Sequence, residues 1–223
     1  MKISRILQIE PGITALIGAG GKTTLMYRLA EELCSSGTVI VCTSTRIFEP
    51  EGLTVVTGGS KEEIIKALRR RRVICAGTSA GNGKLAAPVI GFDELKKLAD
   101  YVIVEADGAH GRPIKAHAAY EPVIPAATNK TVLVTGADAF GQPISGICHR
   151  PELFASIAGV EIRSALTPQI ISRVITRERF GDCLYINKVE DEQAAVSARE
   201  LADLLDIPVA AGSLKKGEYL CLR

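Results

Sequence analysis

A glycine-rich run that ends in a lysine and two threonines is the clearest chemical signal in the sequence. It follows an apolar stretch and precedes a segment of helical periodicity, so glycine amides and a helix N-terminus would converge on one anion. The lysine would neutralise the outer phosphates of a nucleotide, and the first threonine would bind Mg²⁺. The match to a standard phosphate loop is partial, because Leu16 stands where the pattern has its first glycine. The run comprises Gly18, Ala19, Gly20, Gly21, Lys22, Thr23 and Thr24.

Two carboxylates follow the apolar run at residues 101–104. Glu105 and Asp107 would lie at the carboxyl end of a buried parallel strand, where open α/β sheets bind their ligands. We expect Glu105 to hold Mg²⁺, and Asp107 to orient a water molecule or to contact the metal as well. The spacing of Glu105 and Gly108 also matches the D-x-x-G element of GTPases. The alternative is that one of the two acids only caps the next turn.

A third group of polar residues is a candidate for binding the nucleobase. Asn187, Lys188 and Glu190 follow a predicted strand and resemble the guanine-reading N-K-x-D element, with Glu in place of Asp. Ser213 lies in a loop after the last predicted strand, where a second base contact is expected. The extra methylene of Glu190 leaves the choice between ATP and GTP open. An Asn-Lys turn with acidic residues at a helix N-terminus is the alternative.

The elements that must position these residues alternate between strands and helices. Some apolar runs show no polar alternation, which is typical of strands covered on both faces. These runs cover residues 13–17, 39–42, 101–104 and 132–134. Further strands are predicted at 73–76, 183–186 and 208–211, and helices at 22–35, 61–70, 92–99 and 191–205. The order predicts an α/β, doubly wound, mostly parallel sheet flanked by helices on both faces.

Two segments do not fit this alternation. Residues 78–88 are rich in Gly, Ser and Asn, which indicates a hairpin or a mobile loop. Residues 108–129 contain several prolines and little periodicity. Irregular segments of that length are uncommon in a compact domain unless they form a site. We therefore expect one domain over residues 1–223, with a site-forming segment near 108–129.

Composition excludes several classes of protein. The 223 residues are 47% hydrophobic and 4% aromatic, with a net charge of +2. Neutral charge and few aromatic rings argue against a nucleic-acid partner. No apolar run reaches the length of a membrane-spanning helix, and the first residues lack a secretory signal, so we expect a cytoplasmic protein without a membrane partner. The six cysteines form no C-x-x-C pair and are expected to be reduced.

A series of short motifs resembles the YqeC family, the selenium-dependent hydroxylase accessory proteins. In chain order the motifs are GAGGKTT, TSTR, VEADGAHGRPIKAH, EPVIP, VTGADAFG, HRPE, INKVE and AGSL. The resemblance implies a P-loop NTPase-like fold that binds a nucleotide. It also implies an accessory role in maturing selenium-dependent molybdenum hydroxylases, with such an enzyme or its molybdenum cofactor as the partner.

The resemblance also implies a task for the basic residues beyond Asp107. They would bind an anionic second substrate, such as a phosphorylated or pterin-containing molecule, although each is equally consistent with an exposed cation or a satisfied loop histidine. The candidate substrate contacts beyond Asp107 are Arg112, Lys115, His117, His149 and Arg150, together with the acidic Asp138. Arg46, at the end of the second predicted strand, is a separate candidate for binding a phosphate or an acidic substrate.

The leading hypothesis is a Mg²⁺-dependent NTPase, with Lys22, Glu105 and Asp107 as its catalytic residues. One alternative is a small-molecule kinase or ATP-dependent ligase acting on a cofactor precursor. A second alternative is a non-catalytic, nucleotide-gated cofactor chaperone.

Overall fold

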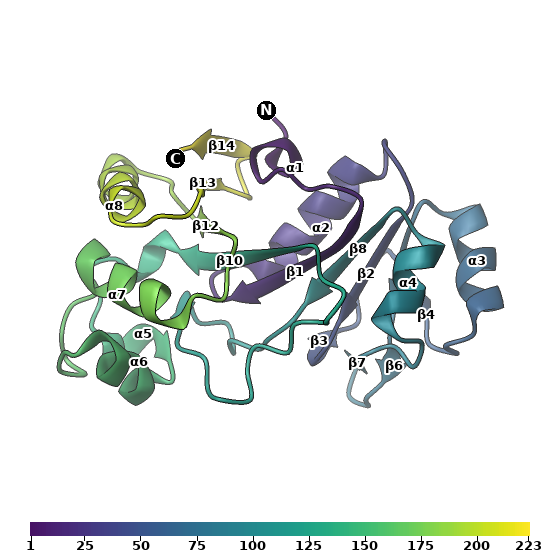
Figure 1. The fold of residues 1–223 in the computed structure, drawn as a ribbon, viewed down its shortest axis with the longest axis horizontal. Coiled ribbons are helices and arrows are strands. Elements are labelled where there is room, and N and C mark those ends of the chain that lie inside the picture. The colour runs from purple at the N-terminus through teal and green to yellow at the C-terminus, as the bar shows by residue number, and fades with distance from the viewer.

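The computed structural model describes residues 1–223, and a nine-stranded sheet forms the centre of the molecule (Figure 1). The strand order is β14-β13-β12-β10-β1-β8-β2-β5-β4. Neighbouring strands are parallel except β14, which is antiparallel to β13. The bounds are β1 Gly12–Gly18, β2 Val39–Thr43, β4 Thr54–Val56, β5 Val73–Ala76, β8 Tyr101–Glu105, β10 Lys130–Gly136, β12 Cys183–Asn187, β13 Val209–Ser213 and β14 Glu218–Cys221. The predicted mostly parallel sheet is confirmed.

The strands predicted from continuous apolar runs are the centre of this sheet. Every residue of β1, β2, β8, β12 and β13 is buried. A strand covered on both faces has no solvent side on which polar residues would alternate, which explains the uninterrupted runs. The β1 strand lies between β8 and β10, so its carboxyl end is flanked by the ends of both neighbours.

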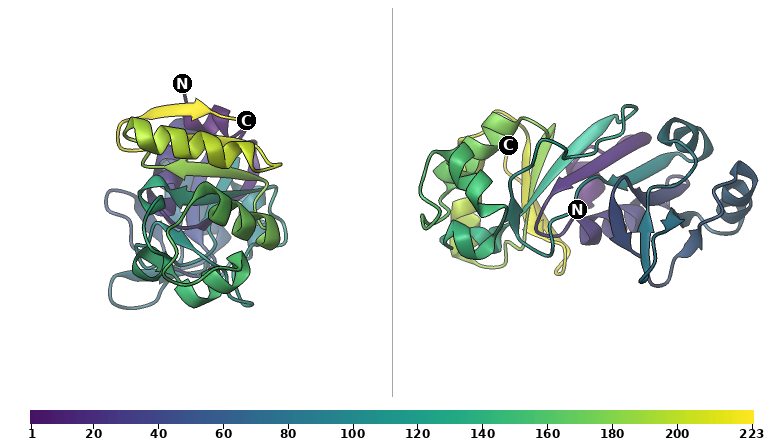
Figure 2. Two further views of the ribbon diagram at one scale, coloured as in Figure 1. Left: turned by 90° about the vertical axis from the view of Figure 1, so that its left-hand side faces the viewer. Right: turned by 90° about the horizontal axis from the view of Figure 1, so that it is seen from below.

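Helices cover both faces of the sheet, as predicted. On one face α1 and α2 pack against the sheet, and on the other face α3 and α4 cover one half while α6, α7 and α8 cover the other half. The right panel of Figure 2 shows these last two groups at opposite ends of the molecule. The bounds are α1 Ile3–Ile6, α2 Lys22–Leu33, α3 Lys61–Arg70, α4 Phe92–Leu98, α5 Ile144–Ile147, α6 Pro151–Ala158, α7 Pro168–Glu178, α8 Glu192–Asp203 and a 3-10 turn η1 Ala137–Ala139. None of the helices has the length and apolar character needed to cross a membrane.

The irregular segment at residues 108–129 fills the gap between the two groups of helices. Its Ile124 packs against Ala15 and Ile17 of β1, on the part of the face that no helix covers. The backbone of Asn129 donates to Ile13 O at 2.8 Å, and its side chain accepts from Ile13 N at 2.9 Å. Within the segment, β9 (Ile114–Lys115) pairs with β11 (Cys148–His149). The segment therefore closes the core and also brings polar residues to the end of β1.

The glycine-rich segment at residues 78–88 is a hairpin, one of the two predicted possibilities. Its strands β6 (Thr78–Ser79) and β7 (Lys84–Ala86) are antiparallel, and β3 (Arg46–Phe48) adds a third strand to this small sheet. The turn contains Asn82 with a φ of 52°, a backbone conformation that asparagine tolerates well.

Candidate functional site

The glycines of the loop between β1 and α2 are required by the backbone. Gly20 has a φ of 81° and Gly21 a φ of 130°, both in the region that disfavours side chains. A Cβ on Gly20 would collide with the backbone of Gly136 and of Pro113. A Cβ on Gly21 would collide with the side chain of Asn187. The loop is therefore folded tightly against the ends of neighbouring strands.

The first amides of the loop donate hydrogen bonds to other groups of the protein. Gly18 N donates to Asp107 Oδ2 at 2.8 Å, Ala19 N to Val134 O at 2.9 Å and Gly20 N to Arg112 O at 3.0 Å. The first amides of a helix have no intrahelical acceptor, so the donors that remain for an anion are those at the start of α2. Residues 18–20 thus shape the loop, while residues 21–24 present its free amides.

A buried ammonium group lies at the centre of the loop. The side chain of Lys22 is 4% exposed, and its Nζ donates to Gly18 O at 2.6 Å. The same Nζ lies 3.1 Å from Asp107 Oδ1 and 3.8 Å from Glu105 Oε1. The predicted lysine and both predicted carboxylates are therefore within one cluster.

Thr23 and Glu105 connect the start of α2 to the end of β8. Thr23 Oγ1 donates to Glu105 Oε2 at 2.7 Å. Burial raises the pKa of Glu105, although the charge of Lys22 and the hydrogen bond from Thr23 act in the opposite direction. Glu105 is placed beside the loop because β8 pairs with β1, with Leu16 opposite Glu105.

Asp107 is fully buried, and its two oxygens have different surroundings. Oδ2 accepts from Gly18 N and lies 2.8 Å from His117 Nε2 and 3.1 Å from Lys115 Nζ. Oδ1 faces Lys22 but accepts no well-directed hydrogen bond. Burial favours a higher pKa for Asp107, but the hydrogen bond from His117 and the charges of Lys22 and Lys115 outweigh it, so the pKa is lowered to about 2.

His117 is held between two carboxylates. Its Nε2 faces Asp107, and its Nδ1 lies 2.7 Å from Glu178 Oε2. Its backbone N also donates to Glu178 Oε1 at 2.7 Å. Burial favours a lower pKa for His117, but the hydrogen bonds to both carboxylates outweigh it and raise the pKa. Because the side chain is 1% exposed and both ring nitrogens are engaged, it has no nitrogen left for a substrate.

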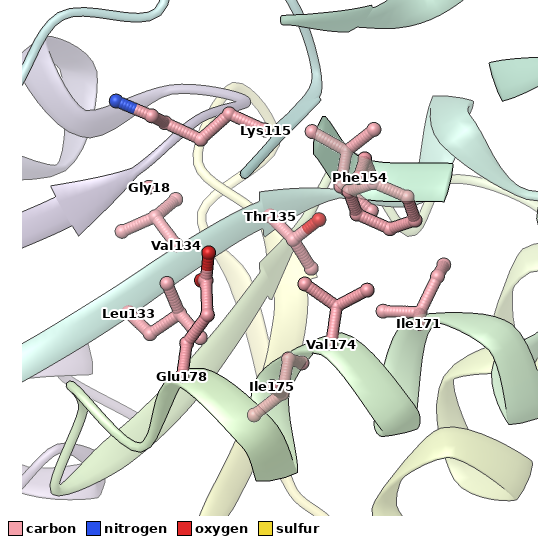
Figure 3. A pocket seen from close by; sticks show the side chains of 11 residues that line it. Gly18, Lys115, Leu133, Val134, Thr135, Phe154, Ile171, Val174, Ile175 and Glu178 are labelled. Atoms are coloured by element: carbon pink, nitrogen blue, oxygen red, sulfur yellow. The ribbon is translucent and has the colours of Figure 1, made fainter. Parts of the chain in front are cut away.

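Glu178 is a site residue that the sequence reasoning missed. It ends α7 and reaches His117 across 61 positions of sequence. Figure 3 shows its carboxylate pointing from α7 toward Gly18 and Lys115, beside a narrow and mostly apolar pocket. No local motif marks this residue, because its partner is defined only by the packing of α7 against β10.

The predicted base-binding residues surround an open hollow beside the start of α2. Asn187 braces it: Nδ2 donates to Gly20 O at 2.8 Å, and Oδ1 accepts from Leu214 N at 3.1 Å. Ser213 Oγ donates to Glu190 Oε1 at 2.8 Å. The amide of Asn187 is thus occupied by backbone groups, whereas the carboxylate of Glu190 lines the hollow. The lining residues are Thr24, Ala137, Asp138, Asn187, Lys188, Glu190, Asp191, Ala194, Ser213, Leu214 and Lys215.

The predicted substrate contacts do not form one cluster. Asp138 pairs with Lys188 at 2.6 Å and lines the hollow instead. Arg46 is an exposed residue of the small sheet without an ion pair. Arg112 is exposed and donates to Gly146 O at 2.6 Å.

The other basic residues form a network beside Asp107. Lys115 and Arg150 each lie 2.8 Å from Glu121 Oε2. Arg150 also donates to His149 Nε2 at 2.9 Å. Burial and the neighbouring charges of Arg150 and Lys115 lower the pKa of His149 to about 4, so this ring is neutral near pH 7. These cations are therefore already partnered by protein groups.

The sheet, the flanking helices and the glycine-lysine-threonine loop after β1 define an α/β protein of the P-loop NTPase-like class. The chain belongs to the YqeC protein family, whose model matches residues 14–152. The YqeC protein of Escherichia coli (strain K12) is 33% identical over 165 residues, which cover 69% of this chain and 63% of that relative. Among solved structures, the signal recognition particle 54 kDa protein from Aeropyrum pernix K1 in complex with GDP aligns with a TM-score of 0.42 and 18% identity, over 95% of this chain and 44% of that one.

Proposed function

We propose that this protein binds a Mg²⁺-nucleoside triphosphate on the loop at residues 18–24 and hydrolyses it. The observation that carries the proposal is the buried Lys22 ammonium, placed at a helix start within 3.1 Å of Asp107 and 3.8 Å of Glu105. Free amides and the α2 dipole favour phosphate at the same point. A lysine in this position would exchange its carbonyl contact for phosphate oxygens.

The residues beside the loop fit Mg²⁺. Thr23 and Glu105 supply the hydroxyl and carboxylate oxygens that this hard cation prefers. No group of three or more His, Cys, Asp or Glu side chains is arranged to hold a metal, so nucleotide oxygens would have to complete its coordination. Bound there, Mg²⁺ would neutralise charge on the phosphate oxygens.

The nucleobase would occupy the hollow lined by Lys188, Glu190 and Ser213. This hollow adjoins Thr24, so a nucleotide whose phosphates lie on the loop can reach it with its base. The carboxylate of Glu190 would accept hydrogen bonds from a guanine edge, whereas adenine would use it less well. Both ATP and GTP remain substrates of the proposal.

Hydrolysis on this site would depend on positioning and charge stabilisation. Asp107 would orient the attacking water through Oδ1, the oxygen that carries no well-directed hydrogen bond. Its lowered pKa makes it a weak base at neutral pH, which favours orientation of the water over proton removal. Lys22 would stabilise negative charge on the phosphates during in-line transfer.

The accessory role implied by the family resemblance belongs to the same proposal. Nucleotide turnover would drive a step in the maturation of a selenium-dependent molybdenum hydroxylase or its cofactor. The test is the molybdenum content and activity of a purified cofactor-free hydroxylase after incubation with this protein, the cofactor and Mg²⁺-nucleotide. A nucleotide-dependent gain in both supports the role, and equal values without nucleotide contradict it.

Phosphoryl transfer to a cofactor precursor is the second candidate, and the network beside Asp107 favours it. Lys115 lies 3.1 Å from Asp107 Oδ2, the other oxygen of the carboxylate that would orient a nucleophile. Arg150 shares Glu121 with Lys115, and its side chain is 22% exposed. An anionic substrate could therefore meet Arg150 from solvent. Turnover that depends on the precursor and places phosphate on it would select transfer over hydrolysis.

The proposed hydrolysis is tested by replacing the central ammonium. Lys22→Ala removes the only lysine buried in the loop, and we expect phosphate release from Mg²⁺-ATP and Mg²⁺-GTP to fall at least about 100-fold. Lys66→Ala, on the exposed face of α3, is the matched control and should retain full turnover. Equal turnover in the Lys22 variant and the control would contradict the proposal.

A further inference from the structure

A line of buried charged groups runs from the loop to α7. Lys22 Nζ is 3.1 Å from Asp107 Oδ1, His117 lies 2.8 Å from Asp107 Oδ2, and Glu178 lies 2.7 Å from His117. The side chains of Lys22, Asp107, His117 and Glu178 are 4%, 0%, 1% and 10% exposed. The line is continuous, and its distal end belongs to α7 and not to the loop.

The contacts fix how the carboxylate of Asp107 is turned. Oδ2 is bound by Gly18 N, by His117 and by Lys115 from different directions. This leaves Oδ1 on the side of Lys22, the group expected to contact phosphate. If His117 were absent, a strong donor on Oδ2 would be lost and the carboxylate could rotate toward Lys115.

His117 in turn is fixed by Glu178. The carboxylate of Glu178 receives both the ring Nδ1 and the backbone N of His117, so it sets the ring orientation and the position of the chain together. The ring of Phe180 packs edge-on against the His117 ring, with 5.3 Å between the ring centroids. Figure 3 shows that Glu178 reaches toward Gly18 from α7, with apolar side chains beside it.

Stability alone is a weak reason for such an arrangement. Buried ion pairs cost desolvation, and well-packed apolar groups often replace them without loss of stability. A functional reason is that these contacts hold one oxygen of Asp107 toward the phosphate site. Misplacing a catalytic group by about 1 Å can cost roughly 100-fold in rate.

We propose that His117, clamped by Glu178, is a positioning residue that holds Asp107 with Oδ1 directed at the nucleophile beside the terminal phosphate. The proposal rests on the proposed nucleotide turnover. It makes the carboxyl end of α7 part of the catalytic apparatus, although α7 contributes nothing to phosphate or base binding.

The test separates turnover from binding. Turnover (kcat and KM) is measured with Mg²⁺-nucleotide, and Kd with a non-hydrolysable analogue, for His117→Ala, His117→Gln and Glu178→Gln. We expect kcat to fall about 100-fold in His117→Ala and Kd to stay unchanged. His117→Gln, whose amide can still donate to Asp107, should recover part of kcat. The kcat of Glu178→Gln should lie between the values of wild type and His117→Ala. Its matched control is Glu200→Gln, on the exposed face of α8.

Several outcomes overturn the proposal. Unchanged kcat in His117→Ala contradicts it while leaving the proposed function intact. Equal losses of kcat and analogue affinity indicate a purely structural role and also contradict it. If His117→Ala does not fold, the same comparison of kcat and Kd is made with Glu178→Gln. A lower kcat with unchanged Kd then supports the proposal, and an unchanged kcat contradicts it. A wild-type protein that binds analogue but turns over no nucleotide contradicts both the hydrolysis and this inference, whereas one that binds no analogue contradicts the proposed nucleotide site itself.

Discussion

The hydroxyl of Thr23 and the carboxylate of Glu105 are joined by a 2.7 Å hydrogen bond between the first turn of α2 and the end of β8. These two oxygen groups come from segments far apart in sequence and meet because β1 and β8 pair in parallel. In the proposed function, their meeting beside Lys22 would supply oxygen ligands for Mg²⁺ next to the bound phosphates.

The metal dependence of nucleotide binding should follow from Glu105. Glu105→Gln keeps the shape of the side chain but removes its charge, so affinity for the Mg²⁺-nucleotide should fall about tenfold. Affinity measured in EDTA should not fall, because the amides and Lys22 remain. Calorimetry with and without Mg²⁺ measures both values, and Glu200→Gln serves as control. A variant with the magnesium dependence of wild type would count against Glu105 as a ligand.

The backbone of the loop should not tolerate a side chain at Gly20. Gly20→Ala combines a positive φ with a collision against Gly136, so the free energy of unfolding should fall by more than about 1 kcal/mol. Gly111→Ala is the control, because Gly111 has a φ of 74° and no neighbour within 4 Å. Urea denaturation compares the two variants. Equal losses would mean that the collision is relieved elsewhere.

The side chain of Asn187, which hydrogen-bonds two backbone groups, should contribute more to stability than that of its neighbour Lys188. Asn187→Ala leaves Gly20 O and Leu214 N without their partner, which should cost about 1–3 kcal/mol of stability and weaken nucleotide binding. Lys188→Ala removes only a half-exposed ion pair with Asp138, which is worth about 0–1 kcal/mol. Thermal and urea unfolding of both variants check this order, and the reverse order would contradict it.

His117 should make stability depend on pH. Its pKa is raised in the folded state, so its contribution is fully present below the unfolded-state pKa of 6.5 and is lost as pH rises through the folded-state pKa. The groups that face the ring are Asp107, Glu178 and Phe180, with Lys115 next to Asp107. The lowered pKa of Asp107 acts only in acid, as pH falls toward about 2.

The measurement is the free energy of unfolding of wild type and His117→Gln between pH 6 and 9. The advantage of wild type should shrink with rising pH, by at most about 1.4 kcal/mol per pH unit. A constant difference over this range would show that folding does not shift the pKa of His117, which would contradict the prediction.

The sequence predicts those strands and loops whose formation depends on residues next to one another in the chain. The strands β1, β2 and β8 were predictable because a buried parallel strand is apolar on both faces, and the loop after β1 because glycine, lysine and threonine follow such a strand. The helices α6 and α7 were not predicted, although Thr167 caps α7 and Pro168 occupies its first turn. This capping signal marks the start of α7 in the sequence itself.

The contacts of the site are less predictable than its elements. His117 looks like a loop histidine free to bind a substrate, and only the packing of α7 shows that Glu178 occupies its second nitrogen. Asn187 likewise looks like a base contact, whereas its amide is taken by the backbone of two loops. Such partners depend on where distant elements dock, which no spacing within one motif specifies.

The proposed function requires that the loop at residues 18–24 bind a Mg²⁺-nucleotide through Lys22. Calorimetric titration with the Mg²⁺ complexes of non-hydrolysable ATP and GTP analogues tests it most directly. We expect saturable binding of at least one analogue at one site per chain, and we expect it to be lost in Lys22→Ala and retained in Lys66→Ala. Binding of GTP analogue alone would assign the hollow at Glu190 to guanine. No binding of either analogue, or equal binding by the Lys22 variant, would mean that this loop is not a nucleotide site built around Lys22.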